Sequence, residues 1–112
     1  MLSANLRLRA RADFNKCYSK GSTGRGKYIT VKSTPNNKSH IRLGVVVSKK
    51  VSKSAVARNR IRRRISAIVR ENIDNKMPVD IVIIANNQSL EASFTDLNND
   101  INKAYVFATR KR

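Results

Sequence analysis

The stretch Ala57-Arg-Asn-Arg-Ile-Arg-Arg-Arg64 constrains the fold of this chain most, because five arginines surround a single isoleucine. Apolar residues of this region recur at the i, i+4, i+7, i+8 spacing of a core-facing helical stripe, as Ile61, Ile65, Ile68 and Val69. Ser54 is placed to cap the start of this helix, which is predicted to run to about Asn72. Such a helix buries its isoleucines and keeps most of its arginines at the surface.

The arginines fall into two groups around this helix. At 100° per residue, Arg60, Arg63 and Arg64 lie opposite the apolar stripe, and Arg58 and Arg62 lie beside it. The second group must run along the edge where the helix meets the sheet, with buried stems and emerging guanidinium groups. Guanidinium pairs bidentately with phosphate, and no acid at i±3 or i±4 relieves the repulsion at Arg60 or Arg63. The pattern favours a polyanion surface over a solvated face with ion pairs.

The charge of the whole chain supports that interpretation. It is +17 over 112 residues, and residues 1–70 hold nineteen Lys and Arg against one acid. A positive field this concentrated attracts polyanions, because each phosphate contact releases condensed counterions. Asn59, among the arginines, can cap or hydrogen-bond a 2′-hydroxyl or a base edge. A membrane surface is less favoured, since no segment pairs Lys and Arg with a broad face of Trp, Phe and Leu.

The remaining composition excludes several classes of protein. No apolar run approaches the ~20 residues of a membrane-spanning helix, and the N-terminus does not resemble a signal peptide. The lone Cys17 excludes an internal disulfide and fits a reducing compartment. One Cys and one His nearly rule out a zinc site. Because the seven acids form no close cluster and there is no His pair, we expect neither catalytic residues nor metal ligands in this chain.

The N-terminal part is predicted to be a basic arm, residues 1–11, followed by a short helix. That helix starts at Asp13 as its cap and ends at Gly21. Phe14 and Tyr18 share one of its faces. This spacing suits a core position at least as well as stacking on unpaired bases.

Three strands are predicted. The glycine-rich residues 21–26 do not match a Walker phosphate loop and are expected to form a turn. The alternation over residues 28–33 and the apolar run over residues 41–48 predict two strands joined as a hairpin. Residues 80–85 predict a buried strand after the arginine helix.

A last helix is expected after Ser93 and Asp96, which form a capping-box-like start. Its apolar face is expected to carry Phe94, Leu97, Ile101, Ala104, Tyr105 and Ala108. The resulting order, α-β-β-α-β-α, predicts an α/β (α+β) two-layer sandwich with helices on a small sheet. Without repeats or a long linker, residues 1–112 are expected to form a single RNA-binding domain.

The sequence resembles the protein subunit of bacterial ribonuclease P over nearly its whole length. The specific part of the resemblance is the Arg-Asn-Arg helix, residues 58–63, placed after the strand Arg42-Leu43-Gly44-Val45 and the segment Val47-Ser48-Lys49-Lys50. The resemblance also includes Leu8, Asp13-Phe14, Ala55 and the run 80–85. The resemblance implies a left-handed crossover around the arginine-rich helix.

The resemblance also implies a function. The holoenzyme, an endoribonuclease, removes the 5′ leader of precursor tRNA, and its catalysis lies in a large catalytic RNA that binds most of the Mg²⁺. This chain would be the cytoplasmic, non-catalytic protein subunit and would need no protein partner or membrane. Contact with the catalytic RNA is expected at Arg58, Asn59, Arg60, Arg62 and Arg63, to which we add Arg64. The leader-binding cleft is expected at Phe14, Tyr18, Lys32, Val46 and Ser48.

Three alternatives remain open from the sequence. A small ribosomal-type RNA-binding protein shares this size and charge but would show no preference for a 5′ leader. A DNA-binding regulator would need a recognition helix and usually a dimer. A small nuclease acting alone would cleave RNA without an RNA subunit.

Overall fold

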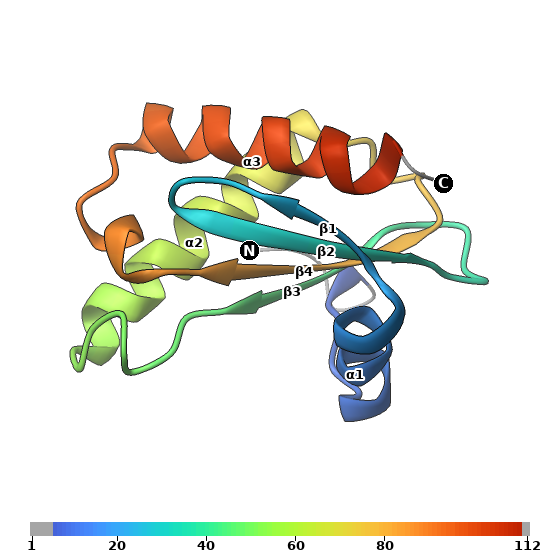
Figure 1. Cartoon of the computed structure of the whole chain (residues 1–112), viewed down its shortest axis with the longest axis horizontal. Coiled ribbons are helices and arrows are strands. Elements are labelled where there is room, and N and C mark those ends of the chain that lie inside the picture. Colours follow the sequence, from blue (N-terminus) through green and yellow to red (C-terminus); the bar gives the residue numbers. More distant parts are fainter. Residues whose placement is uncertain (1–5, 111–112) are drawn as a thin grey trace.

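The computed structural model describes residues 6–110. Its elements, in chain order, are α1 (Arg11–Lys20), β1 (Ser22–Arg25), β2 (Ile29–Pro35), β3 (Arg42–Val46), α2 (Ala55–Asn72), β4 (Val79–Ala85), the 3-10 helix η2 (Asn87–Leu90) and α3 (Phe94–Arg110). The expected α/β fold class is confirmed, with one strand more than predicted. Helices α2 and α3 pack on one face of the sheet, and α1 packs on the other (Figure 1).

The sheet has the strand order β1-β2-β4-β3, so the predicted hairpin between β2 and β3 is wrong. Strand β4 lies between them, antiparallel to β2 and parallel to β3. Parallel neighbours need a crossover, and α2 supplies it. In Figure 1, β3 and β4 both run to the left, α2 returns behind the sheet, and β4 lies above β3. The crossover is therefore left-handed, the rare hand for such a connection, as the resemblance implied.

Strand β1 occupies most of the segment that the sequence predicted to be a turn. It pairs with β2 in an antiparallel hairpin, which Asp100 of α3 holds at its tip. The Asp100 carboxylate accepts three main-chain hydrogen bonds, at 2.8, 2.9 and 3.2 Å, from Lys27, Tyr28 and Ile29. The hairpin therefore depends on a side chain more than seventy residues away, which no local pattern reveals.

The larger core lies between the sheet and the two helices α2 and α3. The predicted stripe of α2 is confirmed, since Ile61, Ile65, Ile68 and Val69 are all buried. In α3 the buried positions are Leu97, Ile101, Ala104 and Ala108. Phe94 is a correction: it is 43% exposed, because it is the first residue of α3 and burial begins one turn later.

Helix α1 starts at Arg11, and the prediction that Asp13 caps it is wrong. Ala10 occupies the cap position without a side-chain hydrogen bond, and Asp13 lies in the first turn. Its carboxylate instead lies 3.3 Å from a guanidinium nitrogen of Arg42 in β3. Asp13 therefore pairs with Arg42 of β3 and does not cap the helix.

Part of the predicted basic arm, residues 6–10, lies against the sheet. Residues 1–5 lie outside the described part, and Leu8 is buried. The Leu8 N–H donates to the Leu43 carbonyl at 2.9 Å, and Arg7 forms an isolated parallel bridge with Leu43. This segment therefore covers the start of the outer edge of β3.

Ser54 caps α2 as predicted, its hydroxyl accepting from the Ala57 N–H at 3.2 Å. Replacing Ser54 with alanine is expected to lower the free energy of unfolding by about 1 kcal/mol, because a main-chain donor at the helix start loses its partner. Urea unfolding at constant pH measures the change. Ser54→Asp should retain the cap, and equal losses in both variants would contradict this explanation.

Candidate nucleic-acid interface

One face of the sheet is only partly covered by helix. Side chains alternate between the two faces of a strand, and α1 packs over the residues near Val82 and Gly44. Beyond α1 the same face carries Thr23, Arg25, Thr30, Lys32, Val46 and Ile84, all of which keep some exposure. We call these six residues the open face.

Three of the five predicted leader-binding residues, Phe14, Val46 and Lys32, lie on the open face or at its junction with α1. Phe14 packs in one apolar cluster with Val46 and Ile84 and keeps part of its surface exposed. Its ring lies over Gly44, where an added Cβ would be 2.5 Å from the Phe14 Cζ atom. Lys32 shares the open face, and its Nζ donates to the Thr23 hydroxyl at 3.2 Å. Glycine at position 44 thus lets the aromatic ring lie against the sheet.

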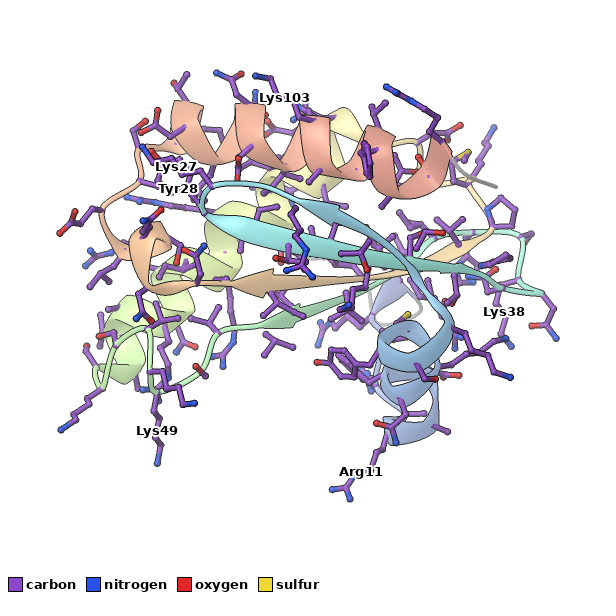
Figure 2. All side chains as sticks on the ribbon, in the orientation of Figure 1. Arg11, Lys27, Tyr28, Lys38, Lys49 and Lys103 are labelled. Carbon is purple, nitrogen blue, oxygen red and sulfur yellow. The ribbon has the colours of Figure 1, made fainter. Side chains whose placement is uncertain are left out.

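The other two predicted leader-binding residues flank this junction. Tyr18 is 43% exposed and lines a depression of about 580 Å³ together with Arg9 and Arg11. Ser48 lies beyond the end of β3, in a second depression that includes Lys50. In Figure 2 the labelled Arg11 and Lys49 extend into solvent from α1 and from the loop after β3. The open face is therefore bordered by basic side chains at both ends of β3.

Apart from Arg64, the arginines at positions 58–64 of α2 divide as the helical spacing predicts. Arg58 Nη1 donates to the Ser52 carbonyl at 2.9 Å, and Arg62 Nη2 donates to the Val47 carbonyl at 3.3 Å. These two side chains lie along the edge where α2 meets the segment after β3. Arg60 and Arg63 are exposed, whereas Arg64, also placed opposite the stripe, is half-buried.

Asn59 holds one of the edge arginines in place. Its side-chain oxygen accepts from Arg62 Nη1 at 2.9 Å. Its direct contact with RNA stays a prediction. Arg42 of β3 forms ion pairs with Asp13 and Asp80, whereas no arginine of α2 forms an ion pair within residues 6–110.

A partly buried charged cluster, which the sequence analysis missed, joins β3, β4 and α1. Arg42 Nε and Nη2 donate to the two Asp80 carboxylate oxygens at 2.8 and 2.7 Å. Asn36 adds a hydrogen bond of 2.8 Å to Asp80. Hydrogen bonding to Asp80 raises the pKa of the Arg42 guanidinium above its ordinary value. The cluster is structural, and it fixes where α1 lies on the sheet.

A second missed feature is a pocket of about 350 Å³ beyond the outer edge of β3. Its polar side chains include Arg7, Arg9 and Arg62, and its apolar wall includes Leu8 and Phe14. We call it the β3-edge pocket. The alternation Arg7-Leu8-Arg9 was its signal in the sequence, since it is typical of an extended segment with one buried side chain.

Together, the exposed α2 arginines, the basic open face and the aromatic side chains of α1 beside it are the features of a small polyanion-binding α/β protein. The family model for ribonuclease P matches residues 2–108. The chain therefore belongs to the ribonuclease P protein family.

Individual relatives are similar to this chain over most of its length. The ribonuclease P protein component of Pseudanabaena sp. is 39% identical over 112 residues, which cover 95% of this chain and 97% of that protein. The component of Clostridioides difficile is 41% identical over 96 residues, covering 84% and 83%. The structure of the Staphylococcus aureus ribonuclease P protein superimposes with a TM-score of 0.84 at 28% identity, covering 93% and 95%. The Thermotoga maritima protein gives a TM-score of 0.75 at 29% identity, covering 86% and 91%.

Proposed function

We propose that this chain binds two RNA elements at once within a ribonuclease P holoenzyme. The α2 arginines bind the catalytic RNA, and the open face with α1 binds the 5′ leader of precursor tRNA. The observation that carries this proposal is that α1 and α2 pack on opposite faces of the sheet. One surface thus anchors the protein while the other remains available for substrate.

The α2 surface suits a folded RNA. The exposed Arg60 and Arg63 present guanidinium groups that pair with phosphates, and Arg58 and Arg62 are oriented by main-chain carbonyls. Arg64 supplements them from a half-buried position. Contacts of this kind depend on the phosphate backbone and are salt-sensitive.

The open face and the adjacent side chains of α1 together suit a single RNA strand. Phe14 and Tyr18 offer aromatic surface on which unpaired bases stack, and Lys32 and Arg25 offer positive charge to the backbone. Val46 and Ser48 extend the same side toward the loop after β3. Combined stacking and charge bind a leader with little dependence on its sequence.

The proposal assigns the cleavage chemistry to the catalytic RNA and to the Mg²⁺ ions that it binds. The part of the chain that the structure describes contains no group of three His, Cys, Asp or Glu side chains suited to a metal ion. Its most buried carboxylate, Asp80, is already bonded to Arg42 and Asn36. The proposal therefore assigns to this chain the binding and orientation of RNA.

The proposed location is the cytoplasm, where precursor tRNA is processed. Within the described residues, no helix is both long and apolar enough to cross a membrane. The family membership favours this function over the ribosomal alternative.

A cleavage assay tests the proposal directly. Precursor tRNA is incubated at low Mg²⁺ with protein alone, with the cognate catalytic RNA alone, or with both. We expect efficient 5′-leader removal only in the combined sample. Cleavage by protein alone would assign catalysis to this chain, and no effect of added protein would contradict the subunit function.

Replacing Arg60 and Arg63 together with alanine is expected to weaken binding to the catalytic RNA by about tenfold or more. The slope of log K against log salt should fall by about 2, because two phosphate contacts are lost. Filter binding over a salt series measures both quantities. Lys103→Ala with Arg110→Ala removes the same charge from α3, where Lys103 points away from the sheet (Figure 2), and should change the slope little. Equal effects of the two pairs would mean that net charge alone attracts the RNA.

A further inference from the structure

The outer edge of β3 leaves one main-chain position open. β3 is an edge strand, and alternate residues of such a strand direct their N–H and C=O groups outward. The Leu43 carbonyl accepts from Leu8, and the Val47 carbonyl accepts from Arg62. Val45 lies between these two residues and has the same outward direction. Within the described residues, its outward N–H and C=O have no hydrogen-bond partner.

The β3-edge pocket lies at this open position. Val45 lines it together with the buried Leu8 and the half-buried Phe14, which form an apolar wall. Arg9 and Arg62 bring positive charge to the same pocket. A cavity of about 350 Å³ lies at the small end of ligand pockets and suits one nucleotide better than a folded RNA segment.

The chemistry of the lining matches the three parts of a nucleotide. An aromatic ring and an aliphatic wall accept the face of a base. An adjacent main-chain donor and acceptor pair with the hydrogen-bonding edge of the same base. Guanidinium groups bind its phosphate.

We propose that the β3-edge pocket holds a single unpaired RNA nucleotide, with its base against Phe14 and Leu8 and its phosphate at Arg9 and Arg62. This inference rests on the proposed function and deepens it. Arg62 belongs to the α2 surface, and Phe14 belongs to α1 beside the open face, so the pocket connects these two surfaces. The nucleotide comes either from the catalytic RNA or from the leader, and the experiment distinguishes these sources.

Ser66 is a position at which the pocket can be tested by substitution. It lines the cavity one turn after Arg62 on α2. Ser66→Leu fills the cavity, whereas Ser66→Ala removes the same hydroxyl and leaves the space open. We expect Ser66→Leu to weaken RNA binding by about tenfold, the value of losing one stacked base, and Ser66→Ala to have little effect. Thermal melting of both variants checks that the fold is unchanged.

Two binding measurements identify the source of the nucleotide. The first is the affinity of the free protein for the catalytic RNA, and the second is the affinity of the holoenzyme for precursor tRNA with and without a leader. A loss confined to the first assigns the nucleotide to the catalytic RNA. A loss that requires the leader assigns it to the substrate. Wild-type affinity of Ser66→Leu in both, in a holoenzyme that still cleaves, would overturn the pocket inference alone.

A cross-linking experiment tests for a nucleotide in the β3-edge pocket even if Ser66→Leu fails to fold. Because Cys17 is fully buried, Ser66→Cys offers a single accessible thiol for a photoreactive maleimide. We expect cross-links to one or two adjacent unpaired nucleotides in the assembled holoenzyme. The exposed Ser39→Cys, in the loop before β3, is the matched control. Cross-links spread evenly along paired RNA, or absent, would contradict a nucleotide in the pocket.

Discussion

Replacing Arg42 with alanine is expected to lower the free energy of unfolding by about 3–5 kcal/mol, because a buried carboxylate loses its charged partner. Asp80 is only 3% exposed, and Arg42 supplies two of its hydrogen bonds, at 2.8 and 2.7 Å. Asn36 then remains as a neutral donor. Urea unfolding followed by circular dichroism at neutral pH measures the loss.

Two further variants separate the ion pair from a general effect of charge. Arg70→Ala removes an exposed arginine of α2 that forms no ion pair within residues 6–110, and it should change stability by about 0.5 kcal/mol or less. Arg42→Met combined with Asp80→Leu removes both charges and should recover much of the loss. If Arg42→Ala unfolded with the same urea midpoint as the wild type, the ion pair would contribute no stability.

The same arginine also connects stability to the proposed function. Arg42 Nη1 lies 3.3 Å from an Asp13 carboxylate oxygen, so one side chain joins the sheet to α1. Helix α1 carries Phe14 and Tyr18, whose placement over the sheet forms the proposed leader-binding surface. The geometry of that surface therefore depends on a charged cluster to which the proposal assigns no RNA contact.

Replacing Gly24 with alanine is expected to cost about 3 kcal/mol, the upper end of the usual range for over-packing. A Cβ atom at this position would overlap the main chain of Ala104 in α3. A helix backbone cannot rotate out of the way as a side chain can, so α3 must move and loosen the contacts of Leu97 and Ile101. Thermal melting measures the effect.

Ser22→Ala is the matched control, since it changes a neighbouring residue of β1 with no side-chain hydrogen bond within the described residues. It should shift stability by about 0.5 kcal/mol or less. An unchanged melting temperature for Gly24→Ala would contradict the close approach of α3 to β1.

Local sequence patterns predicted the structure correctly where a residue's environment depends on its near neighbours in sequence. The stripe of Ile61, Ile65 and Ile68 predicted both the helix and its buried face, because burial follows helical periodicity. Ser54 at the start of α2 was recognised because a cap acts on main-chain groups two or three residues away. The division of the α2 arginines followed from the same geometry except at Arg64, which is half-buried.

Local patterns failed where a distant residue decides the outcome. Residues 22–25 carry no strand signal of their own, and they form β1 because β2 pairs with them and Gly24 admits α3. Asp13 has the chemistry of a helix cap, but the fold places Arg42 beside it. The β3-edge pocket likewise draws its walls from the N-terminal segment, α1, β3 and α2.

The sequence by itself determined the positive charge, the arginine helix, its buried stripe, the buried strand β4 and, through the Arg-Asn-Arg pattern, the family. These properties follow from composition and from spacings within a few residues. Only the tertiary structure decided that β4 separates β2 from β3, that Arg42 joins α1 to the sheet, and that Val45 faces an open pocket. The physical reason is that strand pairing and buried ion pairs are chosen by the free energy of the whole packed chain, in which residues far apart in sequence become neighbours.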